Sequence, residues 1–180
     1  MTHYASQIMH LESLSECKLK IGSYPTFAYN GTGGGGEFTL DSVGANNIHK
    51  IHFLLDSFII PPINWKTTKI LGIPIPPGIR ISIDTTSLDG EIDDNSGIIS
   101  LNLSARFRFS IFSIIKAPDL IVDTVLTSQE IFMKNMSLID EINNRSLLIT
   151  LSGSSTVPVT DNILLNAFLA KSIAPLNTFP

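Results

Sequence analysis

Residues 30–37, Asn-Gly-Thr-Gly-Gly-Gly-Gly-Glu, have the glycine content of a phosphate-binding loop. Three of the glycines satisfy the pattern G-x-G-x-x-G: Gly31, Gly33 and Gly36. In a dinucleotide-binding protein a helix follows this pattern, and backbone N–H groups bind the phosphate. The spacing also resembles a P-loop, but Glu37 stands where that loop has its phosphate-binding lysine. The residues from Glu37 onward favour a strand and not the helix that either loop requires. We therefore expect a mobile hairpin loop that binds no nucleotide, in which Gly33 and Gly35 tolerate alanine.

Two histidines are candidate metal ligands. His49 and His52 would share one face if residues 48–60 formed a helix, but this stretch lacks the ligand spacing of a zinc site. It is densely apolar and ends at two prolines, so we expect a buried strand that carries ordinary, partly exposed imidazoles.

Four acidic residues suggest calcium binding: Asp89, Glu91, Asp93 and Asp94. An EF-hand loop needs glycine where Asp94 stands, and it needs a helix on either side. Neither condition is met, so we expect a solvated hairpin turn at residues 93–97.

Catalytic motifs are absent from the sequence, which has no G-x-S-x-G elbow, no H-E-x-x-H run and no recognisable Cys–His pair. The run Arg106-Phe107-Arg108-Phe109 could stack on bases, but in a strand its arginines and phenylalanines point to opposite faces. A net charge of −4 does not provide the basic surface that nucleic acid requires. We expect a protein that is not an enzyme, binds no nucleic acid and carries no metal or cofactor.

The same run belongs to the strongest structural pattern in the chain. From residue 98 to residue 111, odd positions are apolar and even positions are polar, apart from the first residue, Ile98. This is the period of a β-strand with one wet face, and its apolar row must be covered by other elements. We expect the covered row to include Leu101, Leu103, Phe107 and Phe109.

Shorter strand patterns lie on both sides of this strand. They cover residues 19–29, 37–41, 48–60, 79–84, 87–92, 120–127 and 147–151. Residues 61–77 are apolar and rich in proline, so we expect them to cover an open sheet edge or a barrel mouth. Thr160 could cap a helix over residues 161–171. The predicted fold is mainly β, an antiparallel barrel or closed sandwich of about eight to ten strands with one C-terminal helix.

A chain of 180 residues can form one domain with its own core, which we place at residues 18–180 after a loosely held arm at residues 1–17. No apolar run approaches the roughly 20 residues of a transmembrane helix. Cys17 is the only cysteine, and the first residues do not resemble a secretory signal. We therefore expect a soluble protein of a reducing compartment.

Several turn and core motifs resemble a family of small β-rich proteins of cyanobacteria and plastids. They are Leu88-Asp-Gly-Glu-Ile-Asp, Gly97-Ile-Ile-Ser-Leu, Phe107-x-Phe, Ile115-Lys-Ala-Pro-Asp-Leu, Thr124-Val-Leu-Thr-Ser, Val157-Pro-Val-Thr-Asp and Asn166-Ala-Phe-Leu. The resemblance covers about residues 80–170. It implies a photosynthetic compartment, the plastid stroma or the cyanobacterial cytoplasm, and it assigns no site residues.

Two functions remain open. The first is binding of a small apolar ligand, a lipid or a pigment, within the barrel by Leu101, Leu103, Phe107 and Phe109. The second is that of an accessory or structural protein, which docks onto a larger photosynthetic or membrane complex through an exposed apolar patch. The predicted patch consists of Ile59, Ile60, Ile63, Trp65, Ile73 and Ile75.

Overall fold

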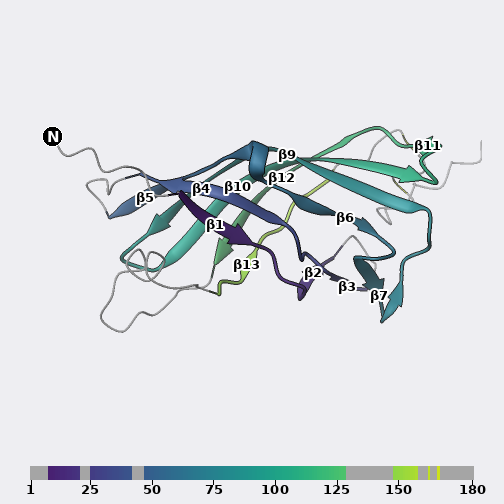
Figure 1. Ribbon diagram of the computed structural model, residues 1–180, viewed down its shortest axis with the longest axis horizontal. Coiled ribbons are helices and arrows are strands. Elements are labelled where there is room, and N and C mark those ends of the chain that lie inside the picture. The colour runs from purple at the N-terminus through teal and green to yellow at the C-terminus, as the bar shows by residue number, and fades with distance from the viewer. Residues whose placement is uncertain are drawn as a thin grey trace, which may run out of the picture.

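Two long strands run along most of the molecule. The computed structural model describes residues 8–20, 25–41, 47–128 and 148–157, together with Asn162 and Asn166. Its longest elements, β9 (Ile79–Asp93) and β10 (Ile98–Ile111), pair as an antiparallel hairpin (Figure 1). At about 3.3 Å per residue, each strand is roughly 45 to 50 Å long. The bounds of β10 are those predicted from its alternation, so this strand is confirmed.

One extra residue, Thr86, keeps the apolar side chains of the hairpin on a single face. Inward residues of β10 are odd-numbered throughout, whereas those of β9 are odd-numbered before Thr86 and even-numbered after it. The Thr86 hydroxyl donates a hydrogen bond of 3.0 Å to the Ser104 carbonyl. Residues 79–84 and 87–92, predicted as two strands, are therefore one strand with a β-bulge.

Two antiparallel sheets are built around this hairpin. The larger has the order β1-β4-β5-β9-β10-β12-β13, in which β6 also pairs with β9 and β11 with β10. Its other strands are β1 (Ile8–Glu12), β4 (Gly35–Leu40), β5 (Ile48–Phe53), β6 (Ile60–Asn64), β11 (Ile115–Lys116), β12 (Leu120–Ser128) and β13 (Leu151–Ser152). The smaller sheet contains β2 (Cys17–Leu19), β3 (Phe27–Tyr29), β7 (Thr68–Ile70) and β8 (Ile73–Pro74). A 3₁₀ helix, η1 (Leu55–Ser57), precedes β6.

The larger sheet curls around one hydrophobic cluster. Six buried residues form its centre: Phe38, Ile51, Leu88, Ile92, Ile99 and Leu101. Leu11 of β1 and Leu151 of β13 both pack against this cluster, so both edges of the sheet reach one core. In the described chain these two edge strands do not pair with each other. The mainly β, antiparallel fold is confirmed, but the sheet is a half-barrel and not the closed barrel or sandwich that we predicted.

The predicted C-terminal helix has no support from the structure. Residues 161–171 lie outside the described residues, except for Asn162 and Asn166. The helix therefore stays a prediction. No helix in the described part of the chain is long and apolar enough to cross a bilayer.

A second cluster joins the two sheets. Its buried residues lie between the start of the hairpin and the smaller sheet: Ile63, Ile75, Ile81, Phe109 and Ala117. Tyr29 of β3 packs against this cluster, and its hydroxyl donates to the Pro61 carbonyl of β6. Burial, with a smaller effect of the nearby Cys17 side chain, raises the pKa of Tyr29 to about 12.

The glycine run is not the mobile loop that we expected. Gly35 and Gly36 belong to β4 and pair with β1, and Gly35 also exchanges two backbone hydrogen bonds of 2.8 Å with Ile59. A Cβ on Gly35 would lie 1.9 Å from the Leu11 carbonyl oxygen. A Cβ on Gly36 would lie 2.7 Å from Phe58 Cα. Glycine is needed because neighbouring backbone approaches β4 closely on more than one side.

We expect Gly35→Ala to destabilise the protein by about 3 to 5 kcal/mol, because the methyl group meets the Leu11 carbonyl and φ is +122°. Gly33→Ala is the matched control, since Gly33 has φ +86° but nothing within 4 Å of an added Cβ. Its expected cost is about 1 to 2 kcal/mol. Urea denaturation measures both values, and small, equal losses would restore the mobile-loop interpretation.

Tyr29→Phe should lower stability at neutral pH by about 1 kcal/mol, because the Pro61 carbonyl loses its donor. The loss should shrink as pH rises from 10 toward 12, because the raised pKa makes the folded protein resist ionisation that the unfolded tyrosine undergoes. Urea denaturation of both proteins at neutral and alkaline pH measures this difference. A difference that does not change with pH would contradict the burial of this hydroxyl.

Candidate functional site

The four residues predicted to hold a ligand pack into the core. Leu101 and Phe109 are buried in different clusters, and Leu103 and Phe107 are partly buried against those same clusters. Leu101 also fills the space above Gly90, because a Cβ added to Gly90 would lie 2.4 Å from the Cδ2 atom of Leu101. The row is therefore divided between two cores.

Two open hollows lie on the described surface, with volumes of about 380 and 400 Å³. The first lies between β6 and β9 and includes Thr85, whose hydroxyl is buried and has no hydrogen-bond partner among the described residues. The second lies between β10 and β12, and Leu103 is its only member of the predicted ligand row. Both hollows are open, whereas a lipid or pigment site encloses most of its ligand.

The predicted docking patch is divided between core and surface. Ile63 and Ile75 are buried in the second cluster, so they cannot face a partner. Ile60 is partly buried. Three members are exposed: Ile59, Trp65 and Ile73.

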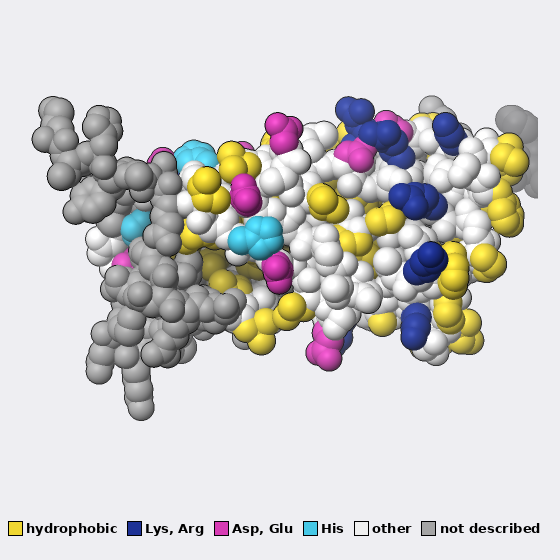
Figure 2. Space-filling model, in the orientation of Figure 1, with side chains coloured by type: hydrophobic (Ala, Val, Ile, Leu, Met, Phe, Trp, Pro, Cys, Tyr) yellow, Lys and Arg dark blue, Asp and Glu magenta, His cyan; other side chains and the backbone are white. Residues whose placement is uncertain are grey.

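The labels of β7 and β11 lie at one end of the molecule (Figure 1), and exposed apolar side chains gather in the turns next to these strands. Figure 2 shows them at the right-hand end of the surface, with Lys and Arg beside them. We define the apolar end as six exposed side chains: Trp65, Leu71, Ile73, Phe112, Ile114 and Ile115. Leu71 is 79% exposed and Ile114 is 84% exposed. Large exposed apolar patches mark interaction sites in other proteins, so the apolar end is the candidate site of this chain.

Backbone pairing holds the turns of the apolar end together. Ile79, the first residue of β9, pairs with Ile111 at the end of β10. Arg80 pairs with Asn64 at the end of β6, directly before Trp65. The N–H of Phe112 donates to the carbonyl of the residue before β9 at 2.8 Å. The turns after β6 and β10 are therefore fixed by strands that form the core, and the Leu71 turn is closed by the pairing of β7 with β8.

Leu71 and Phe112 have a left-handed backbone conformation that bulky residues rarely adopt. Leu71 has φ 50° and is followed by Gly72 at φ 83° in the turn between β7 and β8. Phe112 has φ 49° and is followed by Ser113 at φ 61° in the turn between β10 and β11. Such turns favour Asn and Gly, and this conformation costs other residues about 1 to 2 kcal/mol. The turns therefore expose two large apolar side chains at a conformational cost.

Cations surround the apolar end. Within the described ranges, no carboxylate lies within ion-pair distance of four of them: Lys66, Lys69, Arg80 and Lys116. Arg106 and Arg108, farther along β10, each pair with an aspartate. The four cations closest to the exposed turns therefore keep their positive charge without an ion-pair partner in the described chain.

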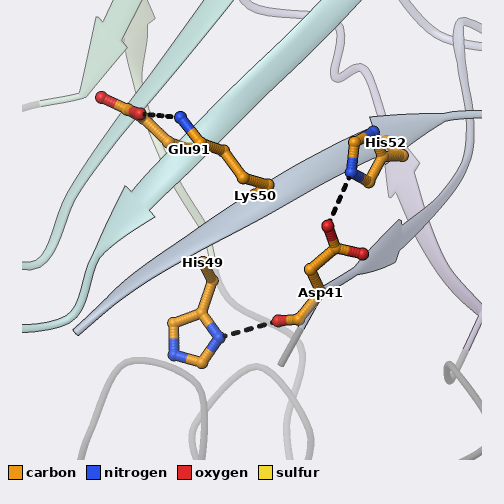
Figure 3. Close-up of polar contacts among 5 residues, drawn as sticks. All are labelled: Asp41, His49, Lys50, His52 and Glu91. Atoms are coloured by element: carbon orange, nitrogen blue, oxygen red, sulfur yellow. Dashed lines mark hydrogen bonds and ion pairs between the residues drawn. The ribbon is translucent and has the colours of Figure 1, made fainter. Parts of the chain in front are cut away.

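The two predicted histidines do not converge on one site. β5 directs His49 into the core and His52 toward solvent, and Asp41 meets them at different atoms (Figure 3). The Asp41 carbonyl lies 3.2 Å from His49 Nδ1, and its carboxylate lies 3.0 Å from His52 Nε2. Lys50, between them in sequence, donates to Glu91 at 2.6 Å. The described residues contain no group of three His, Cys, Asp or Glu side chains that could hold a metal ion.

Asp93, the last residue of β9, and the residues after it form the hairpin turn that we predicted. The Ser96 hydroxyl donates to the Asp93 carboxylate at 2.8 Å, and the Asn95 N–H donates to it at 3.0 Å. These hydrogen bonds, that of Ser96 first, lower the pKa of Asp93. The carboxylate thus closes the turn at the opposite end of the hairpin from the apolar end.

Comparisons with protein-family models, with curated proteins and with solved structures find no match to this chain. The resemblance to a β-rich family of cyanobacteria and plastids therefore stays a prediction.

The sequence predicted only part of the apolar end. Trp65 and Ile73 belong to the predicted docking patch, whereas Leu71, Phe112 and Ile114 were not predicted to belong to it. The signal for these residues is a bulky apolar residue in a short turn between two strands, where Asn or Gly is usual. Phe112 is hard to recognise because it continues the apolar run of β10.

Leu71→Asn should raise the free energy of unfolding by about 1 kcal/mol, because Asn-Gly suits the turn between β7 and β8. Leu148→Asn is the matched control, since Leu148 is 77% exposed and lacks a positive φ. Its expected effect is within about 0.5 kcal/mol. Thermal and urea denaturation test this prediction, and a loss of stability in Leu71→Asn would contradict it.

Proposed function

We propose that this protein is a non-enzymatic accessory protein that attaches to a larger assembly through its apolar end. One observation carries the proposal: large apolar side chains face solvent from turns where Asn or Gly would cost less. Leu71, the clearest case, is too exposed to contribute much to the core. Its side chain gains free energy only when something else covers it.

The magnitude of this gain fits attachment by the whole end. Full burial of Leu71, Ile73 and Ile114 would contribute roughly 1.5 to 3 kcal/mol for each side chain. Association itself costs about 4 to 15 kcal/mol. Three side chains alone give a weak complex, so the remaining apolar residues and the neighbouring cations must contribute as well.

Binding of a small apolar ligand has less support. Its predicted residues already pack against two separate clusters, and only Leu103 among them lines either of the two open hollows. In the apolar end, by contrast, Leu71, Ile73 and Ile114 are mostly exposed and belong to neither hydrophobic cluster of the described chain.

The test is to express the tagged protein in its cell of origin and to separate extracts by size and by sedimentation with membranes. Wild type should migrate with a larger assembly or a membrane fraction. A variant with Leu71→Ser and Ile114→Ser should migrate as the free chain. Ile8→Ser with Leu148→Ser, which removes two exposed apolar side chains elsewhere, should behave as wild type.

Two results would contradict the proposal. One is a wild-type protein that migrates as the free chain. The other is an apolar-end variant that stays attached as strongly as the control variant, which would place the attachment surface elsewhere on the molecule.

A further inference from the structure

Charge is distributed unevenly along this chain. Residues 57–83 and 95–118 contain none of the 16 Asp and Glu residues. They contain three Lys or Arg residues each: Lys66, Lys69 and Arg80, and Arg106, Arg108 and Lys116. Both segments reach the apolar end, and Figure 2 shows Lys and Arg gathered over that half of the molecule. The protein is acidic as a whole, yet the surface around its apolar end is basic.

The smaller sheet adds to this basic surface. Lys18 and Lys69 each pair in register with Ala28, so they lie on the same exposed face of the sheet, two strands apart. Their backbones are therefore roughly 10 Å apart. No carboxylate of the described chain pairs with either lysine. Two like charges in this arrangement repel each other, and an anionic surface would relieve the repulsion.

The apolar side chains project from separate turns instead of lining one groove. Leu71 lies in the turn between β7 and β8, and Ile114 in the turn between β10 and β11. Trp65 follows β6, and the ammonium group of Lys66 lies 5.4 Å from the centre of its ring. A protein partner would need a matching depression for each turn, whereas a bilayer interface accepts separate apolar side chains. Tryptophan and lysine together are favoured at the level of the lipid headgroups.

Resting on the proposed function, we infer that the apolar end binds the surface of an anionic lipid bilayer. Lys66, Lys69 and Lys116 contact the negatively charged headgroups, while Leu71 and Ile114 enter the boundary between headgroups and acyl chains. The turns are fixed by backbone pairing before binding, so little conformational entropy is lost. The acidic turn between β9 and β10 lies at the other end of the hairpin, away from the bilayer.

The experiment is sedimentation of the purified full chain with lipid vesicles. Two compositions are compared: phosphatidylcholine alone, and equal parts of phosphatidylcholine and phosphatidylglycerol. We expect binding to the anionic vesicles, weaker binding at high salt and little binding to phosphatidylcholine alone.

Charge variants test the orientation of the protein on the vesicle. Lys69→Gln and Lys116→Gln should each weaken binding to anionic vesicles about fivefold. Lys50→Gln is the control, because it makes the same change in net charge on β5, where Lys50 pairs with Glu91 away from the apolar end. It should leave binding unchanged.

Apolar variants test insertion. Leu71→Ser with Ile114→Ser should reduce binding at least tenfold, because the inserted area is lost. Ile8→Ser with Leu148→Ser is the control and should bind as wild type. The melting temperature of every variant is measured first, so that a loss of binding is read only from folded protein.

The outcomes separate this inference from the proposed function. If wild type ignores anionic vesicles while the apolar-end variant still leaves its assembly in cell extracts, the bilayer inference fails and a protein partner is implied. If vesicle binding occurs but is lost equally in the control variants, the inference about this surface fails. If neither vesicle binding nor attachment to the cellular assembly depends on the apolar end, both proposals fail.

Discussion

The fold depends on the antiparallel pairing of β9 and β10 and on the single residue that corrects its register. Apolar residues of β9 change from odd to even positions along the strand, so a regular strand would turn half of them to solvent. Thr86 absorbs the change as a bulge, and its hydroxyl satisfies the Ser104 carbonyl. Both halves of the hairpin then face the same side, and each half carries its own hydrophobic cluster.

This arrangement separates stability from the proposed attachment. The first cluster is enclosed by the curled sheet, and the second by the smaller sheet, which Tyr29 connects to β6. The turns beyond the second cluster are fixed by the pairing of β9 with β10 and β6 and, at Leu71, of β7 with β8, yet their exposed side chains add little to either core. Leu71 can therefore occupy an unfavourable conformation without endangering the fold, as is common at functional sites.

The sequence predicted the structure well where the alternation of residues within one strand reports their burial. It predicted poorly the positions whose packing depends on residues distant in sequence. Alternation alone located β10, since every second residue reports burial. The glycine run was misjudged because its need for glycine comes from Leu11 and Phe58, neither of which lies next to it in sequence. In the docking patch, Ile63 and Ile73 look alike in sequence, and only the packing of the smaller sheet buries the first and exposes the second.

The central claim, that the apolar end enters a lipid interface, is tested most directly through the fluorescence of Trp65, the only tryptophan in the chain. It lies in the apolar end with 48% of its surface exposed, so its emission reports contact at that surface. The measurement adds anionic vesicles whose acyl chains carry bromine, a contact quencher. The account predicts a blue shift and strong quenching of the emission. Unchanged emission from vesicle-bound protein would contradict it, because the protein would then be attached by another face.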